Sequence, residues 1–251
     1  APKHLDSLTL AKEETLFATR FDKERLYVVT FRVIDPLFVV DLSDPRNLKV
    51  LGELEIPGYS TYLQPMGDRL LSVGVEDRHV AISLFDVADT SKPSLMSRVY
   101  LGDKDAYTWS EGNYDEKAVG FMKDQNLLLV PFESYGQQGV ERSFQLIDVS
   151  EESLTLRGVI DHQFQPRRAT ALDHVLVSIS GRELLTVDAT DRDNPKVLAT
   201  LPIAWSVDRV LTLDDYIVQV ENGNTWGDNV GPVVRLSKRD DPESIVGELT
   251  L

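Results

Sequence analysis

A strand-like block that ends in aspartate returns along the chain, and this repeat constrains the fold more than any other feature. The first copy is Leu37-Phe38-Val39-Val40-Asp41, followed by Leu42-Ser43-Asp44-Pro45. The later copies end at Asp86, Asp148 and Asp188, so the spacings are 45, 62 and 40 residues (41 to 86, 86 to 148 and 148 to 188). Arg235 is expected at the fifth marker position, 47 residues after Asp188 (188 to 235).

Each repeat holds four short strand-like runs bounded by glycine, proline, aspartate and asparagine. A repeat of roughly 40–50 residues with four strands is the period of a β-propeller. We therefore predict an all-β fold with about five four-stranded antiparallel blades, at 12–58, 59–102, 103–161, 162–203 and 204–251. The marker aspartates are expected to form turns, because short polar side chains bond the backbone nearby and proline restricts φ.

The two ends of the chain carry similar sequences. Leu5-Asp6-Ser7-Leu8-Thr9-Leu10 echoes Val246-Gly247-Glu248-Leu249-Thr250-Leu251, which ends the fifth blade. Residues 1–11 therefore read as an extra outer strand placed before five complete blades. A closed five-bladed ring has no use for such a strand, so we expect an arc of a larger propeller of roughly six to eight blades.

Several segments resemble a known family. Asp35-Pro36-Leu37-Phe38-Val39-Val40-Asp41, Lys49-Val50-Leu51-Gly52-Glu53-Leu54 and Asn126-Leu127-Leu128-Leu129-Val130-Pro131 are similar to the secreted bacterial and archaeal β-propeller-domain proteins. These proteins are distantly similar to WD repeats, and the block also resembles the LVIVD cell-surface repeat. The match is close over about residues 15–180 and implies an exported, surface-associated propeller. It brings no established activity, and the family's domain is usually longer than this chain.

Propeller topology predicts where a site would lie. The connections between blades (D–A) and the loops between the second and third strands (B–C) share one end of the molecule, and the A–B and C–D turns share the other. All four long loops are expected at the first end: Gly102–Glu116, Glu133–Glu141, Asp161–Arg167 and Glu221–Gly231. Long loops on a rigid scaffold often carry binding sites.

The candidate binding residues are expected at the same end of the molecule and are large aromatic and basic side chains: Tyr107, Trp109, Arg168, Trp205, Arg209 and Trp226. Aromatic rings of this kind suit protein or sugar surfaces, although they could equally pack down their own loops. Arg168 and Arg209 lie four residues before Leu172 and Leu213, near the predicted channel mouth. They either clamp an anion or pair with Asp161 and Asp208.

Composition excludes several classes of function. A formal charge of −15 disfavours nucleic acid and anionic membranes as partners. The chain has no cysteine, no Gly-x-Ser-x-Gly elbow and no pair of its four histidines at ligand spacing, so no catalytic residue is assigned. No cofactor is expected. The metal content stays unknown, with calcium as an option at Asp103-Lys104-Asp105 or around Asn222, Asn224 and Asp228.

The sequence thus favours an exported, non-catalytic module at the cell surface or in the periplasm that presents its loop end to a protein or a glycan. Two alternatives stay open. One is a hydrolase or lyase with its active site at the channel mouth, which fold analogy alone supports. The other is a structural spacer in a surface protein. Further blades from another chain or segment are expected to cover the open flanks of the arc.

Overall fold

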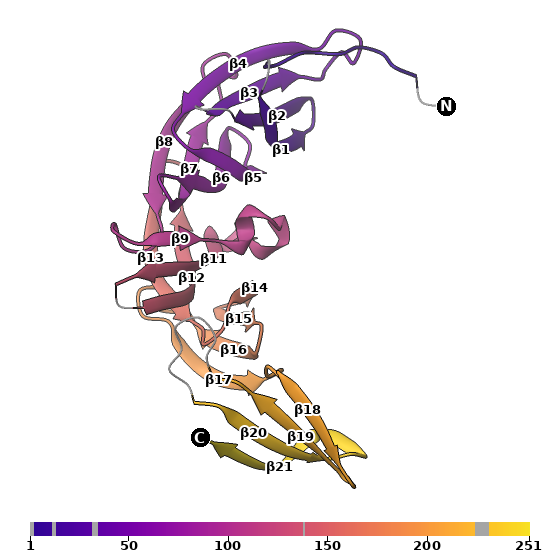
Figure 1. Ribbon diagram of the computed structural model, residues 1–251. Coiled ribbons are helices and arrows are strands. Elements are labelled where there is room, and N and C mark those ends of the chain that lie inside the picture. The colour runs from indigo at the N-terminus through magenta and orange to yellow at the C-terminus, as the bar shows by residue number, and fades with distance from the viewer. Residues whose placement is uncertain (1–2, 12–13, 32–34, 138, 224–230) are drawn as a thin grey trace. The chain divides into compact units, whose positions relative to one another are not determined.

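The computed structural model describes residues 3–11, 14–31, 35–137, 139–223 and 231–251. Five antiparallel sheets follow one another along the chain, with their strands in sequence order except that β9 pairs with β11 (Figure 1). Helix in the described residues is limited to three single 3₁₀ turns, η1 (Glu111–Asn113), η2 (Glu116–Ala118) and η3 (Lys123–Gln125). None of the helices in these residues is long and apolar enough to cross a membrane. The chain divides into two compact units, residues 1–201 and 202–251, which are described separately.

The first unit holds four sheets, which are the first four predicted blades. Sheet 1 contains β1 (Thr15–Asp22), β2 (Arg25–Phe31), β3 (Asp35–Asp41) and β4 (Lys49–Ile56). Sheet 2 contains β5 (Tyr59–Pro65), β6 (Arg69–Glu76), β7 (His79–Asp86) and β8 (Ser94–Tyr100). Sheet 3 contains β9 (Tyr107–Trp109), β10 (Gly120–Met122), β11 (Leu127–Gly136), β12 (Gly139–Val149) and β13 (Leu154–Asp161). Sheet 4 contains β14 (Pro166–Leu172), β15 (Val175–Ser180), β16 (Glu183–Asp188) and β17 (Lys196–Pro202).

The second unit holds sheet 5, made of β18 (Arg209–Leu213), β19 (Tyr216–Glu221), β20 (Val233–Lys238) and β21 (Asp241–Thr250). Its register corrects the fifth marker position. In sheets 1 to 4 the marker aspartate pairs with the first residue of the second strand, as Asp41 does with Arg25. In sheet 5 that first residue, Tyr216, pairs with Lys238 and not with Arg235.

The apolar core of the first unit lies in the seams between successive sheets. On β11, Leu128 and Val130 pack with residues of sheet 2, whereas Leu127 and Leu129 pack with residues of sheet 4. A strand that is buried on both faces needs apolar residues at every position, which explains the unbroken Leu127–Val130 run. The seam of sheets 1 and 2 is built in the same way around Tyr27 and Phe85.

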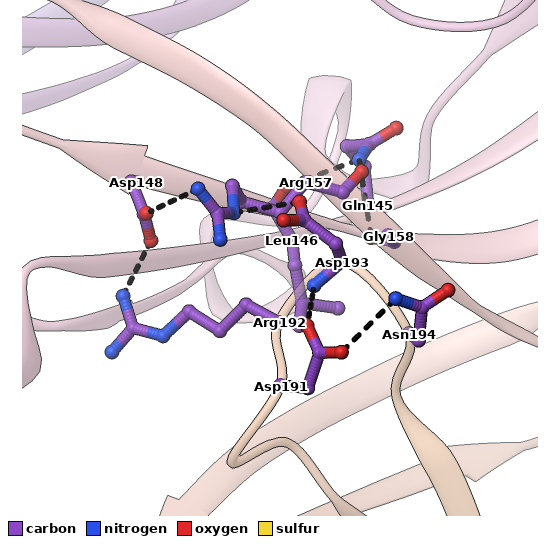
Figure 2. A network of polar contacts seen from close by, with 9 residues as sticks. All are labelled: Gln145, Leu146, Asp148, Arg157, Gly158, Asp191, Arg192, Asp193 and Asn194. Atoms are coloured by element: carbon purple, nitrogen blue, oxygen red, sulfur yellow. Dashed lines mark hydrogen bonds and ion pairs between the residues drawn. The ribbon is translucent and has the colours of Figure 1, made fainter.

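The marker aspartates form turns as predicted, with one exception. Asp41 Oδ1 accepts a hydrogen bond from Ser43 N at 2.9 Å, and Asp86 and Asp188 bind the backbone two residues ahead in the same way. The bond from Ser43 N to the charged form lowers the pKa of Asp41. The pKa of Asp188 is lowered first by a side-chain hydrogen bond from Thr190 and then by the backbone bond from the same residue. Asp148 instead binds Arg157 and Arg192, which join sheets 3 and 4 (Figure 2).

Three expected segments differ from the prediction. Residues 3–11 do not form the expected outer strand, because they have no regular secondary structure. The segment nevertheless packs on sheet 1, where Leu10 and Ala11 cover Val28 and Phe38. The Gly102–Glu116 loop contains β9, so the first strand of sheet 3 is split and the two 3₁₀ turns η1 and η2 lie between its halves. Most of the Glu133–Glu141 loop is strand, since β11 and β12 extend to a tight hairpin.

Candidate functional site

The D–A connection and the B–C hairpin of sheet 3 lie together, as the topology predicts. A cavity of about 530 Å³ is lined by Asp103–Ala106 on one side and by Ser134 and the hairpin, up to Glu141, on the other. Asp103, Asp105 and Glu141 supply carboxylates at its rim, and all three residues are exposed. The loop end of sheet 3 therefore carries an open, polar hollow.

A buried ion pair anchors an exposed tyrosine beside this hairpin. Glu133 Oε1 accepts a hydrogen bond from Arg142 Nε at 3.1 Å, and both side chains are about nine-tenths buried. Tyr135 donates its hydroxyl to Glu133 Oε2 at 2.9 Å, while the residue stays 39% exposed. Burial, followed by this bond to a carboxylate, raises the pKa of Tyr135 to about 12. The ring is held in one orientation by a charge pair that solvent hardly reaches.

Sheet 2 repeats the arrangement at the same end. Glu76, the last residue of β6, binds Arg98 at 2.5 Å, and Tyr100 donates its hydroxyl to the same carboxylate oxygen at 2.7 Å. Arg98 also donates to Ser83 Oγ and to the carbonyl of Pro57. Its guanidinium is therefore satisfied on several sides, and the Tyr100 ring, 42% exposed as a residue, is again anchored.

Two of the predicted aromatic residues lie on β9, next to these clusters. Tyr107 pairs with Tyr135 in the sheet, their ring centroids are 5.9 Å apart, and the guanidinium of Arg78 lies 5.9 Å from the Tyr107 ring centre. Trp109 stacks on Tyr114 at 5.9 Å and is only partly exposed. Tyr107 thus presents a ring to solvent, whereas Trp109 packs against its own loop.

Arg168 holds the η1–η2 insertion. Its Nη2 lies 2.5 Å from Asp115 Oδ2, so it pairs with this residue and not with Asp161, which accepts a bond from Ser143. Arg167 binds Glu111 at 2.8 Å in the same insertion. Both ion pairs are substantially exposed, so each contributes about 1 kcal/mol or less. Arg168 therefore forms a structural ion pair, which was one of the two expectations, but its partner is Asp115 and not Asp161.

The second unit contains the other predicted residues, apart from Trp226, which lies outside the described residues. Trp205 donates Nε1 to Gln219 Oε1 at 2.5 Å, and the guanidinium of Arg235 lies 5.6 Å from its ring centre. Arg235 in turn binds Glu221 at 2.8 Å, which is again a buried Glu–Arg pair beside an aromatic ring. Arg209 lies exposed on β18, and Asp208, its expected partner, accepts a bond from Asn222 N.

A serine, a histidine and a glutamate meet in the seam of sheets 3 and 4. His162 Nε2 lies 2.5 Å from Ser178 Oγ, and Nδ1 lies 3.1 Å from Glu183 Oε1. Burial, which outweighs the contact with Glu183, lowers the pKa of His162. Ser178 is 0% exposed, so its hydroxyl is closed to solvent, although the three groups stand in the order serine, histidine, glutamate. The cluster satisfies buried polar atoms in the seam.

Sequence reasoning located the loop end but missed the Glu–Arg pairs within it. A glutamate lies near the end of the second strand in sheets 2, 3 and 5, and its arginine comes from the third or the fourth strand. The recurrence of Glu76, Glu133 and Glu221 could have been a signal, but 41 acidic residues obscured it. Among the described residues no group of three or more His, Asp or Glu could hold a metal ion. Asn224 and Asp228, named for calcium, lie outside those residues.

Fold and repeat together define a multi-bladed β-propeller, and comparison with known proteins places it in a family. The model of the β-propeller domain family matches residues 5–184, so the chain belongs to that family. An uncharacterized protein of Methanocaldococcus jannaschii is 42% identical over 182 residues, which are 71% of this chain and 27% of that protein. An uncharacterized protein of Archaeoglobus fulgidus is 44% identical over 128 residues, which are 51% of this chain and 20% of that protein. The solved WD40 β-propeller domain of Doa1 is 16% identical, with a TM-score of 0.40 over 93% of this chain and 67% of that one.

Proposed function

We propose that this propeller is a binding module that contacts a protein or a glycan through the loop end of sheets 2 and 3. The observation that carries the proposal is the set of anchored tyrosines: Tyr100 and Tyr135 each donate to a glutamate that an arginine already holds. A tyrosine held in this way loses little rotamer freedom on binding, so its contact area contributes more to affinity.

The chemistry of the surface fits such a ligand. Tyrosine offers an apolar ring face and a polar edge, and both protein interfaces and sugar-binding surfaces use this combination. The adjacent cavity of about 530 Å³ has the size of a small-ligand pocket and offers carboxylates that accept hydrogen bonds. Exposed Tyr107 lies beside Tyr135, which extends the aromatic surface toward Arg78.

A paired screen tests the proposal. The full chain and its Tyr107→Ala/Tyr135→Ala variant are applied to an array of defined oligosaccharides and to a displayed library of random 12-residue peptides. We expect binders that the double variant loses and that a Tyr216→Ala control keeps. Tyr216 is a matched control because all three tyrosines are 39% exposed, yet Tyr216 lies in the second unit. Binders that the double variant retains, or a screen without binders, would count against the proposal.

We also propose that the protein is exported and associated with the cell surface. The resemblance to secreted propellers supports this location, and the absence of cysteine is compatible with it. Fractionation of the source cells with an antibody against the chain tests it. Recovery in the cytoplasmic fraction alone would contradict export and would leave the binding surface to be judged separately.

A further inference from the structure

Neighbouring sheets of the first unit contact each other where one small residue of an outer strand lies against the C–D turn of the next sheet. The outer strands of sheets 1, 2 and 3 each contain a β-bulge, and the residue beside the bulge lies under the C–D turn of the next sheet. In sheet 1 this residue is Gly52, where an added Cβ would overlap the carbonyl oxygen of Thr90 and lie 3.0 Å from Pro93 Cδ. In sheet 3 it is Gly158, where a Cβ would lie 2.6 Å from both Asp193 O and Pro195 Cδ. Figure 2 shows this second contact, with the Asp191–Asn194 turn against the Gly158 strand.

The seam between sheets 2 and 3 has the same geometry but different residues. Ser97 occupies the place beside the bulge of β8, opposite Leu84. Its hydroxyl accepts a hydrogen bond from Leu154 N at 3.1 Å. Leu154 is the first residue of β13 and closes the C–D turn of sheet 3 as Pro93 does in sheet 2, because the next residue pairs with the marker aspartate in both sheets. A side-chain acceptor thus replaces glycine in the one seam where the turn does not end in proline.

The two kinds of seam follow from the chemistry of the residue that ends the turn. In both proline-ended turns a backbone carbonyl oxygen lies at least as near to the added Cβ as the proline ring does: Thr90 O overlaps it whereas Pro93 Cδ lies at 3.0 Å, and Asp193 O and Pro195 Cδ both lie at 2.6 Å. Turn backbone and proline ring together therefore require a partner without a Cβ, and proline leaves no N–H that needs an acceptor. Leucine brings an N–H that must find an acceptor once the seam is closed, so Leu154 requires a polar side chain. A proline-ended turn therefore pairs with glycine, and a leucine-ended turn pairs with a hydrogen-bond acceptor.

Sheet 1 follows the same rule on the face turned away from sheet 2, where the partner of its C–D turn is the N-terminal segment. Its turn ends in Leu48, whose N–H donates to Asp6 Oδ2 at 2.9 Å. This bond is the main reason why the pKa of Asp6 is lowered. Asp6 lies 35 residues before the marker Asp41, and Gly52 lies 34 before Asp86. Residues 5–10 therefore stand where the outer strand of a preceding sheet would stand, although they form no strand.

Sheet 5 carries the outer-strand part of such a contact. Gly247 lies beside the bulge of β21 and opposite Leu236, the position that Gly52 and Ser97 occupy in their sheets. Within the second unit no described atom of a residue other than its chain neighbours lies within 4 Å of a Cβ built on Gly247. The glycine has ordinary backbone geometry, because its φ is not positive. Neither a backbone requirement nor a neighbour in its own unit explains the missing side chain.

We propose that Gly247 is the docking position for the C–D turn of a propeller blade that lies outside this chain, and that this turn ends in proline. The two proline-ended turns of the first unit share the pattern Asp-x-x-Asp-x-x-x-Pro, at Asp86–Pro93 and Asp188–Pro195. Both are already seated, on Gly52 and Gly158. The C–D turn of sheet 1 does not fit Gly247. It ends in Leu48, whose N–H would face a glycine and lose its bond to Asp6. This inference is independent of the proposed binding function.

Titration of the isotope-labelled full chain with a hairpin peptide tests the proposal by NMR. The peptide is a cyclised copy of residues 184–198, which carries the turn Asp188–Pro195. The control peptide replaces the proline by leucine, which adds an N–H without an acceptor. We expect saturable shifts of the β21 amides around Gly247, and binding about tenfold weaker for the control peptide. A Gly247→Val chain should lose these shifts.

Four outcomes, from three tests, would overturn the proposal. Equal binding of the two peptides would refute the proline rule, and absence of shifts, or shifts that persist in Gly247→Val, would refute the docking position. Sedimentation of the full chain supplies the third test. Self-association that Gly247→Val abolishes would identify a second copy, and not a separate blade, as the partner.

Discussion

Replacing Gly158 with valine should weaken the seam between sheets 3 and 4. The Cβ would lie 2.6 Å from Asp193 O and from Pro195 Cδ, and 2.9 Å from Arg192 O. A backbone oxygen and a proline ring cannot move away by changing rotamer, so the C–D turn must shift as a whole. Overpacking of this kind costs about 1–3 kcal/mol. The shift also strains the bond from Gly158 N to Arg192 O, now 2.8 Å, whose loss costs about 1 kcal/mol more.

The free energy of unfolding should therefore fall by about 2–4 kcal/mol, which corresponds to a fall in Tm of roughly 4–16 °C for a unit of this size. Calorimetry and urea unfolding followed by circular dichroism measure it. Gly247→Val is the matched control, because this glycine has the same place beside a bulge, but a Cβ added to it would meet no described atom of a residue other than its chain neighbours within 4 Å in its unit. We expect its stability to change by less than about 1 kcal/mol. Equal losses in the two variants would refute the steric argument.

Three further predictions concern buried polar groups. His162 has a lowered pKa because burial disfavours its charged form, so the unfolded chain binds the extra proton. The free energy of unfolding should fall as the pH drops below about 6.5, and His162→Gln should reduce this slope in urea titrations. Glu133→Gln should lower the pKa of Tyr135 from about 12, but not as far as the ordinary tyrosine value of 10.0, because the burial that raises it remains. Titration of the phenol followed by absorbance measures the change. Arg98→Ala should lower the free energy of unfolding by about 3 kcal/mol, because it leaves a buried carboxylate unpaired. Arg20→Ala, which breaks an exposed pair, should lower it by less than about 1 kcal/mol. Equal losses for the two variants in urea unfolding would contradict this.

The repeat was readable from the sequence because each sheet needs the same local signals. Continuous apolar runs such as Leu127–Val130 mark strands buried on both faces, and aspartate with proline marks the turn that follows. These signals are local, so they predict strand order and turns without knowledge of neighbouring sheets. They failed where tertiary contacts decide the outcome. Arg235 looks like a marker in the linear pattern, but register places Lys238 there.

The candidate site was only partly readable for the same reason. The position of the loops follows from topology, so Tyr107 could be assigned to the loop end from the sequence alone. Partners of charged residues depend on distances between strands that sequence spacing does not give. Arg168 was therefore expected near Asp161, although the η1–η2 insertion delivers Asp115 to it from a separation of 53 residues. Likewise, Trp109 proved to pack on Tyr114.

The two ends of the sheets face different physical demands. At the turn end, a C–D turn lies on a residue without a Cβ or donates to one small side chain, as at Gly158 and Ser97. Any added atom there must be accommodated by the neighbouring sheet, so the turns have little freedom to vary. At the loop end, Glu133 and Arg142 satisfy one another within a single sheet. Because the loop end does not need its neighbour to complete the pair, an anchored side chain such as Tyr135 can be replaced by another residue while the seams stay closed. This difference is a physical reason to look for ligands at the loop end and for further blades at the turn end.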